Sequence, residues 1–314
     1  MDLIIELILL IIGFVLLIKG ADVFVDGASN VAYHYKVSTI VVGLTIVAIG
    51  TSAPEAAVSI TASLAGSNAI SLGNVVGSNI FNILGVIGIS ALIANLKVDK
   101  VLIKRDFPFL IISSIGLLLV AYLFGEISRI IGAIFLILIA IYIYRMVKQA
   151  NENKENNGDN IVEAEISIPQ CILYIVLGLA AVIIGSDLVV DSSSYIASLF
   201  GLSQALIGLT IVAIGTSLPE LVTSITALKK GDHGIVIGNV LGSSIFNILF
   251  ILGISSVIVP MPIEPKMLTD ILIMTIITIL GAIFARSEEE IDRKEGIVLI
   301  ILFLIYMTFI IIRN

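Results

Sequence analysis

The sequence predicts an all-α polytopic membrane protein with ten transmembrane helices, built as two inverted five-helix repeats in which helices two and seven are broken. Of its 314 residues, 58% are hydrophobic and 13% are charged, whereas an average soluble domain has roughly 25% charged residues. A soluble protein of this size needs more polar surface, and a β-barrel would show short alternating segments. Long unbroken apolar runs instead indicate membrane-spanning helices.

Ten apolar runs, each near the length of about 20 residues that crosses a bilayer core, follow one another along the chain. They cover 3–26, 38–65, 70–95, 101–123, 127–147, 168–191, 203–228, 235–259, 267–285 and 295–312. Residues 148–167 form a polar tract without apolar periodicity, which predicts a solvated linker. The expected organisation is a first repeat over 1–147, the linker over 148–167, and a second repeat over 168–314.

The duplication is visible as two pairs of matching segments at an offset of 165. Residues 43–55 (GLTIVAIGTSAPE) match 208–220 (GLTIVAIGTSLPE) at twelve of thirteen positions. Residues 73–85 (GNVVGSNIFNILG) match 238–250 (GNVLGSSIFNILF) at ten of thirteen. Shared composition would align Ile and Leu, but not Gly, Thr, Ser, Pro, Glu and Asn. Five spans per repeat place the second repeat upside down in the membrane, as in many secondary transporters.

The distribution of Lys and Arg predicts the orientation. Thirteen of these residues lie in loops on one side and three on the other, and the bias holds in all five loops of the richer side. Because cytoplasmic loops are enriched in Lys and Arg, the linker is expected in the cytoplasm and both termini outside the cell membrane.

Two carboxylates lie midway along predicted spans, Glu55 in span two and Glu220 in span seven. An ionised carboxylate at this depth is costly without compensation. A structural explanation would be a carboxylate that snorkels to the interface or pairs with a buried base, but the nearest candidate base, Lys19, lies near the end of span one. A site that binds cations through negative ligands is the functional interpretation.

The residues before each glutamate predict a break in the helix. Pro54 and Pro219 remove a backbone donor and clash with the carbonyl four residues earlier, which belongs to Gly50 or Gly215. Carbonyls freed in this way can face a cavity and bind cations. The alternative is a simple kink, which the glutamate directly after each proline makes less favourable.

The second motif places further oxygen atoms on spans three and eight. Ser78 and Asn82 are four residues apart, as are Ser243 and Asn247, so each pair shares one helix face. Hydrogen bonding between helices is the alternative role for such residues in membranes. With the glutamates, they would form a site of hard oxygen ligands, which suits Ca²⁺ and Na⁺.

A weaker set of acidic residues lies near the ends of spans one and six. Asp22 and Asp26 correspond to Asp187 and Asp191 at the same offset. Inverted repeats would place each pair at an opposite mouth, where acidic groups concentrate cations. Solvated helix ends are the alternative, and the two interpretations remain open.

At these two motifs the sequence resembles the sodium/calcium exchanger branch of the Ca²⁺/cation antiporter superfamily. The resemblance covers nearly the whole chain: ten spans, inverted repeats, G-[TS]-S-x-P-[ED] in each half, and G-S-x-x-x-N after it. It implies an exchanger that extrudes Ca²⁺ with the inward Na⁺ gradient, commonly three Na⁺ per Ca²⁺. The implied ligands are the side chains of Glu55, Glu220, Ser52, Ser217, Ser78, Ser243, Asn82 and Asn247, with the carbonyls of Ala48, Thr51, Ala213 and Thr216.

Asn247 stands where some archaeal and potassium-dependent members have Asp, so we expect no K⁺ requirement. The linker contains no Ca²⁺-binding loop of the D-x-[DN]-x-[DN]-G kind, and we expect no Ca²⁺ sensor within the chain. The expected substrates are Ca²⁺ and Na⁺ within a lipid bilayer, with no further cofactor, no obligate protein partner and no nucleic acid.

Three other functions are less favoured by the sequence. A proton/Ca²⁺ exchanger also uses membrane carboxylates, but that branch usually carries G-N-x-x-E around its key glutamate. An uncoupled cation channel would use the same oxygen ligands, although repeats and broken helices favour a transporter. An intramembrane enzyme is disfavoured, since the spans lack H-E-x-x-H and a plausible Ser/His pair.

Overall fold

The computed structural model describes residues 3–156, 164–199 and 213–313 as a helical bundle with four additional two-residue strands. Eight helical segments in these ranges are long and apolar enough to cross a membrane, and a bent pair of helices makes a ninth. The first half contains α1 (Leu3–Tyr35), α2 (Thr39–Val42), α3 (Ala48–Thr51), α4 (Ala53–Leu64), α5 (Asn68–Phe81), α6 (Gly88–Ile93), α7 (Phe107–Phe124) and α8 (Arg129–Asn156). The second contains α9 (Ile168–Leu199), α11 (Ala213–Gly215), α12 (Leu218–Lys229), α13 (His233–Phe246), α14 (Leu252–Ile258), α15 (Pro265–Ser287) and α16 (Arg293–Arg313).

The break predicted in span two is present. The segments Thr39–Thr51 and Ala53–Leu64 meet at an angle of 48°. In span seven, α11 and α12 are separate helices on either side of Thr216 and Ser217. The beginning of this span, predicted from residue 203, lies outside the described residues.

Three helices continue past the ends of the predicted apolar runs. α1 extends to Tyr35 instead of 26, and α9 extends to Leu199 instead of 191. α8 extends to Asn156, so the first part of the predicted linker is helical. The residues that extend α8 include Lys, Gln, Glu and Ala, which are good helix formers outside an apolar layer as well. Hydropathy therefore marks where a helix leaves the apolar layer and not where the helix ends.

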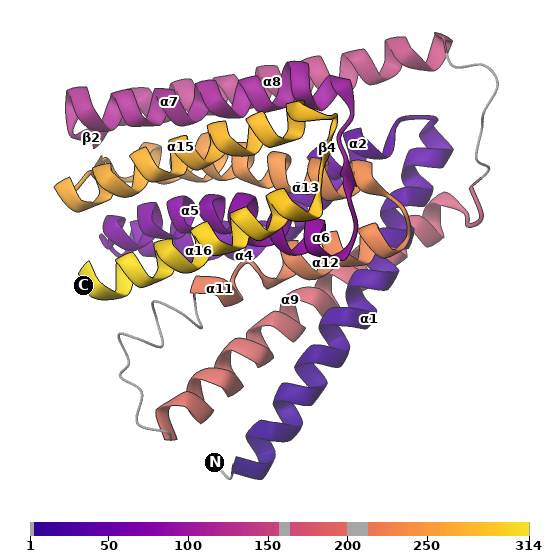
Figure 1. Ribbon diagram of the computed structural model, residues 1–314, viewed down its shortest axis with the longest axis horizontal. Helices are drawn as coiled ribbons and strands as arrows, with labels where there is room; N and C mark the ends of the chain where they lie inside the picture. Colours follow the sequence, from indigo (N-terminus) through magenta and orange to yellow (C-terminus); the bar gives the residue numbers. More distant parts are fainter. Residues whose placement is uncertain (1–2, 157–163, 200–212, 314) are drawn as a thin grey trace.

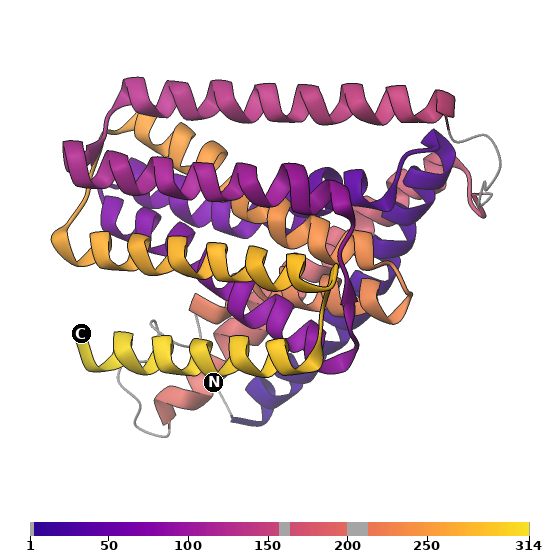
Figure 2. The same ribbon diagram turned by 45° about the horizontal axis from the view of Figure 1, so that its top comes forward.

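Helices α5–α6 and α13–α14 form the centre of the bundle. In their most apolar windows, 78% and 94% of residues are buried, against 17–39% for the other six long segments. Helices α7, α8, α15 and α16 run along this centre, and α1 and α9 lie side by side at an angle to it, on one side of the bundle (Figure 1, Figure 2). The predicted motifs of spans three and eight therefore lie on the most enclosed elements of the molecule.

Glycines bring α1 and α9 together along their length. A Cβ atom built on Gly178 would lie 2.5 Å from the backbone nitrogen of Phe24, and one on Gly20 would lie 2.9 Å from the carbonyl oxygen of Gly178. These are contacts with backbone that cannot move aside. Small residues in membrane helices allow such close approach of two backbones.

Two short antiparallel strand pairs connect the halves at opposite ends of the bundle (Figure 1). They join β1 (Leu96–Lys97) to β4 (Glu290–Ile291), and β2 (Glu126–Ile127) to β3 (Met261–Pro262). Leu96 pairs with Ile291, and Ile127 pairs with Met261. Each strand pair therefore holds a loop of one half against a loop of the other.

Candidate functional site

The two glutamates lie in the first turns of the helices that follow the breaks. Glu55 belongs to α4 and Glu220 to α12, each directly after a proline in the first turn. Both are essentially inaccessible to solvent, with 0% and 1% of their surface exposed. The unpaired backbone N–H groups of a helix N-terminus favour negative charge, so each break helps to hold its carboxylate.

The serine of each break contacts the glutamate of the other half. Ser52 Oγ donates to Glu220 Oε1 at 3.1 Å, and Ser217 Oγ donates to Glu55 Oε1 at 3.0 Å. Neither serine makes the side-chain cap expected at a helix N-terminus. Each hydroxyl instead bonds to the opposite half, so the two copies of the motif that contains the break lie together.

The serines of the second motif are also at this place. Ser78 Oγ lies 3.1 Å from Ser217 Oγ and 3.5 Å from Glu55 Oε1. Ser243 Oγ donates to the carbonyl of Ala48 at 3.3 Å. The central helices thus contact both breaks.

Asn82 and Asn247 each begin a π-helical segment, η2 (Asn82–Ile87) and η5 (Asn247–Ile251). A further π segment, η1 (Gly43–Val47), precedes the break in span two. Another, η3 (Leu102–Asp106), precedes α7. Such segments shift the register of backbone hydrogen bonds and are frequent at functional sites.

Several buried polar atoms here have no hydrogen-bond partner among the described residues. They are Oε2 of Glu55, Oε2 of Glu220, Oδ1 of Asn247, and both amide atoms of Asn82. Buried polar groups in proteins are normally satisfied, so each of these requires an explanation. Four of the five atoms are oxygens from the predicted ligand residues, as a cation-binding site requires.

The four residues predicted to bind cations through their carbonyls have different surroundings. The carbonyl of Ala48 accepts the backbone N–H of Ser52 as well as Ser243 Oγ. Thr51 is buried, and its hydroxyl donates to Asn239 Oδ1 at 3.0 Å. Ala213 begins α11, and Thr216 lies between α11 and α12.

The carbonyl of Gly215, freed by Pro219, accepts a hydrogen bond of 2.7 Å from Ser186 Oγ on α9. The equivalent position in the first half, Ala21, has no hydroxyl. This hydrogen bond joins α9 directly to the break in span seven.

Asn74 and Asn239 support the site and were not predicted. Asn74 Nδ2 donates to the carbonyl of Glu55 at 3.2 Å and to Ser59 Oγ at 3.0 Å. Asn239 Nδ2 donates to the carbonyl of Glu220 at 3.3 Å and to Ser224 Oγ at 3.1 Å. Both follow a glycine in the repeated segments, so their alignment at the offset of 165 could have identified them.

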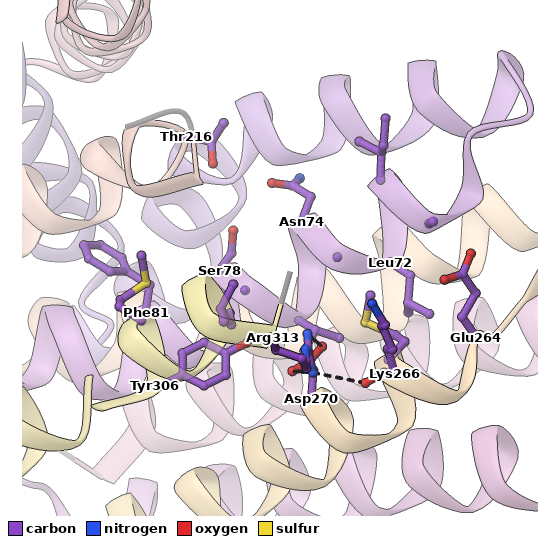
Figure 3. Close-up of a pocket in the computed structure, with 18 of the residues that line it drawn as sticks. Leu72, Asn74, Ser78, Phe81, Thr216, Glu264, Lys266, Asp270, Tyr306 and Arg313 are labelled. Carbon is purple, nitrogen blue, oxygen red and sulfur yellow. Dashed lines mark hydrogen bonds and ion pairs between the residues drawn. The ribbon is translucent and has the colours of Figure 1, made fainter. Parts of the chain in front are cut away.

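A cavity of about 470 Å³ reaches this region from between α5, α15 and α16. Figure 3 shows the side chains of Asn74, Ser78 and Thr216 facing the same space. Asp270 and Arg313 form a bidentate ion pair at its wall, with N–O distances of 2.9 and 2.8 Å. The cavity therefore connects the polar centre with the end of the bundle where α15 begins and α16 ends.

Comparison with known proteins identifies the family. A sequence model described as sodium/calcium exchanger protein matches residues 5–148 and 171–312, which is most of the chain. The chain belongs to the sodium/calcium exchanger family. The prediction of a transporter and not an enzyme is therefore confirmed.

Several relatives of this chain align over almost their whole length. A putative antiporter, CaxA of Alkalimonas amylolytica, is 39% identical over 95% of this chain and 96% of its own. The sodium/calcium exchanger MaX1 of Methanosarcina acetivorans is 33% identical over 96% and 97%. A structure of the sodium-calcium exchanger NCX_Mj, soaked with 2.5 mM Na⁺ and 0.1 mM Ca²⁺, has a TM-score of 0.85 at 34% identity, covering 97% of this chain and 98% of that one.

Asp22 and Asp26 of α1 both form an ion pair with the same lysine. Lys230 Nζ lies 2.7 Å from Asp22 Oδ1 and 2.6 Å from Asp26 Oδ1. Burial lowers the pKa of Lys230, but its hydrogen bonds to Asp22 and Asp26 outweigh this effect and raise the pKa above the ordinary value of 10.5. Nearby, Asp232 accepts a hydrogen bond of 2.9 Å from Ser29 Oγ, and burial raises the pKa of Asp232.

The equivalent acidic residues on α9 have different surroundings. Asp187 and Asp191 are exposed. The position equivalent to Lys230 is Ala65, which has no charge to offer them. The lysine clamp, defined as Lys230 with Asp22 and Asp26, therefore joins the two halves at one place, and the lysine has no equivalent beside Asp187 and Asp191.

A second buried acidic pair lies farther from the centre and was missed in the sequence. Asp106 accepts a hydrogen bond of 2.7 Å from Tyr142, and Arg105 contacts both of its oxygens at 2.9 Å. Asp270 and Tyr306 stand at the equivalent positions. Their offset is 164 instead of 165, because the second half has one residue fewer between Met261 and Asp270 than the first has between Leu96 and Asp106, and this hid the correspondence.

Proposed function

We propose that this chain exchanges Na⁺ for Ca²⁺ across the cell membrane, electrogenically and without K⁺, with both ions competing for one central site. The observation that carries the proposal is the meeting of Glu55 and Glu220, each with one buried oxygen free of any described partner. Carboxylate, amide, hydroxyl and carbonyl oxygens are the ligands that Ca²⁺ prefers. We assign the ligand role to the predicted set: Glu55, Glu220, Thr51, Thr216, Ser52, Ser217, Ala48, Ala213, Ser78, Ser243, Asn82 and Asn247.

The charge of the site supports the coupling scheme. Among the described residues, no group of three or more Asp, Glu, His or Cys side chains could hold a metal ion, so in this scheme two ionised glutamates supply the negative charge. One Ca²⁺ neutralises them, whereas three Na⁺ leave one positive charge. Each cycle then moves one net charge, worth about 2.3 kcal/mol per 100 mV. Asn247 adds no carboxylate that a K⁺ ion would balance.

The proposed architecture is ten spans in two inverted repeats, over 1–147 and 168–314, joined by a cytoplasmic linker over 148–167. The strand pairs support it. Leu96 and Met261 are equivalent at the offset of 165, and each pairs with a strand residue of the other half, Leu96 with Ile291 and Met261 with Ile127. The hydrogen bonds of Asn74 and Asn239 support it in the same way.

The orientation can be tested by cysteine labelling. With Cys171→Ser as background, a cysteine replaces the exposed Glu289 or the exposed Glu126. We expect a membrane-impermeant maleimide added to intact cells to label Glu126→Cys, and Glu289→Cys only after lysis. The reverse pattern would overturn the proposed placement of both termini outside.

For the transport cycle we infer alternating access, in which α1 and α9 slide together against the other spans. Their backbone contact at Gly20 and Gly178 makes them one unit, and Ser186 of α9 contacts the break at Gly215. The cavity in Figure 3 supports access to the site from the end proposed to face outside, where Lys266 and Arg313 lie.

The decisive experiment is Ca²⁺ uptake by proteoliposomes loaded with Na⁺ and diluted into buffer without Na⁺ or K⁺. Saturable uptake that needs internal Na⁺ is expected, and Glu55→Gln should abolish it. A matched batch with an outward proton gradient tests the alternative: uptake driven only by protons would make the chain a proton/Ca²⁺ exchanger. Uptake without either gradient, with no counterflow, would indicate a channel.

A further inference from the structure

Asn79 lies between the predicted ligands Ser78 and Asn82 on α5 and is itself buried. Its Nδ2 donates to the backbone carbonyl of Ser244 at 3.2 Å. Its Oδ1 accepts from Asn247 Nδ2 at 3.1 Å. Asn79 therefore connects the central helix of one half to the central helix of the other.

These two hydrogen bonds fix the direction of both amides. The Ser244 carbonyl can only accept, so Asn79 must turn its NH₂ group toward it and present its oxygen to Asn247. Asn247 must then turn its own NH₂ group toward Asn79. The Oδ1 of Asn247 remains, buried and without a partner among the described residues.

The corresponding arrangement is missing in the other half. At the offset of 165, Asn79 corresponds to Ser244, and Asn247 corresponds to Asn82. Ser244 Oγ and both amide atoms of Asn82 have no partner within the described ranges. One asparagine of the site is thus held in a single orientation, and its repeat equivalent is not.

We propose that Asn79 is a positioning residue that holds Asn247 as a neutral oxygen ligand for the transported cation and selects an amide over a carboxylate at position 247. This inference rests on the proposed function. An aspartate at position 247 would place a carboxylate oxygen against Asn79 Oδ1, where both atoms are acceptors. Turning Asn79 over would only move the conflict to the Ser244 carbonyl.

A cycle of variants tests this by equilibrium binding of radioactive Ca²⁺ to the purified full chain. Asn79→Ser copies the residue of the other half and should weaken Ca²⁺ binding about 10-fold, the lower end of the 10–100-fold typical when the partner of a ligand is lost. In an Asn247→Ala background the same change should have no further effect. In an Asn247→Asp background it should improve binding, because it removes the opposing acceptor.

Ser244→Ala is the matched control, since it removes a buried hydroxyl without a described partner at the equivalent position. It should bind Ca²⁺ as the parent does. If Asn79→Ser lowers Ca²⁺ affinity 10-fold both in the parent and in the Asn247→Ala background, the inference is overturned, because Asn79 would then act by a route that does not involve Asn247. So would Asn79→Ser binding as the parent does.

Folding and function are kept separate in this design. Thermal unfolding is measured for every variant. If Asn79→Ser alone unfolds, the comparison of Asn247→Asp with and without Asn79→Ser stays informative, because it tests the same change in a second background. If the parent chain binds no Ca²⁺, the proposed function fails. If the parent binds and the coupling is missing, only the role of Asn79 fails.

Discussion

Ser52 Oγ donates a hydrogen bond of 3.1 Å to Oε1 of Glu220, across 168 positions of the chain. Ser217 does the same for Glu55. Each carboxylate therefore depends on a residue of the opposite half for one hydrogen bond. Neither half contains a complete site, which explains why the two motifs occur together at matching positions.

Removing one of these hydroxyls should weaken ion binding. Hydrogen bonds to charged groups contribute about 1.5–3 kcal/mol, so Ser52→Ala and Ser217→Ala should each lower Ca²⁺ affinity about 10- to 100-fold. Equilibrium Ca²⁺ binding measures the effect. The control is Ser63→Ala on α4, a buried serine whose hydroxyl has no described partner. An equal loss in the control would contradict the assignment.

Neutralising either glutamate should have a larger effect. Glu55→Gln and Glu220→Gln keep the shape of the side chain but remove the negative ligand. We expect a loss beyond the about 10–100-fold typical for residues that only support a ligand. Na⁺-driven Ca²⁺ flux and Ca²⁺ binding should both fall. Glu126→Gln, at an exposed glutamate in β2, should leave both unchanged.

The close contact of α1 and α9 predicts that added volume is not tolerated there. A methyl group on Gly178 would meet backbone atoms of Phe24 and Gly20 at 2.5 and 2.8 Å. Gly178→Ala should therefore destabilise the fold by about 1–3 kcal/mol, as overpacking does, seen as a lower Tm. Gly116→Ala on α7 meets no described atom within 4 Å and should be neutral or stabilising by about 0.4–1 kcal/mol.

The lysine clamp predicts a direction-dependent effect of Lys230→Met. The clamp joins α1 to the end of α12 at one mouth only, and exposed ion pairs contribute about 0.2–1 kcal/mol. The variant should change the ratio of forward to reverse Ca²⁺ flux by up to about five-fold. Equal changes in both directions would contradict the prediction.

The same clamp should be insensitive to pH over the neutral range. Because the pKa of Lys230 is raised in the folded state, its contribution is fully present below the ordinary lysine pKa of 10.5 and is lost only as pH rises through the higher folded value. The difference in Tm between the parent and Lys230→Met should thus stay constant between about pH 6 and pH 9. If this difference in Tm disappears at a pH below 9, the charge of Lys230 is not its cause.

Hydropathy located the central helices, and repetition identified polar residues that lie together in the structure. The boundaries of α5–α6 and α13–α14 differ from the predicted spans by only one or two residues. Glu55, Glu220, Ser52 and Ser217 meet in one place. Aligned polar residues at a fixed offset carry this information because apolar composition does not produce them.

The remaining features depend on contacts that a single sequence does not encode. The role of Asn79 follows from where α5 meets α13, and the repeat alignment hides it because its equivalent is a serine. The π-helical starts at Asn82 and Asn247 come from a shift in backbone hydrogen bonds without any special residue. Lys230 could not be assigned to Asp22 and Asp26, because 204 positions separate it from Asp26.

The two strand pairs separate the helices that are fastened to one another through their loops from α1 and α9, which are not. They fasten loops of both halves together at each end of the bundle, and every described strand belongs to this fastening. The loops that bear the strands connect α6, α7, α8, α14, α15 and α16, and neither α1 nor α9 adjoins a strand. Amide hydrogen exchange should accordingly be slow in the helices that the strands connect and faster in α1 and α9, which should open more often. In each cycle α1 and α9 would then move, while the predicted ligands Ser78 on α5 and Ser243 on α13 stay in place.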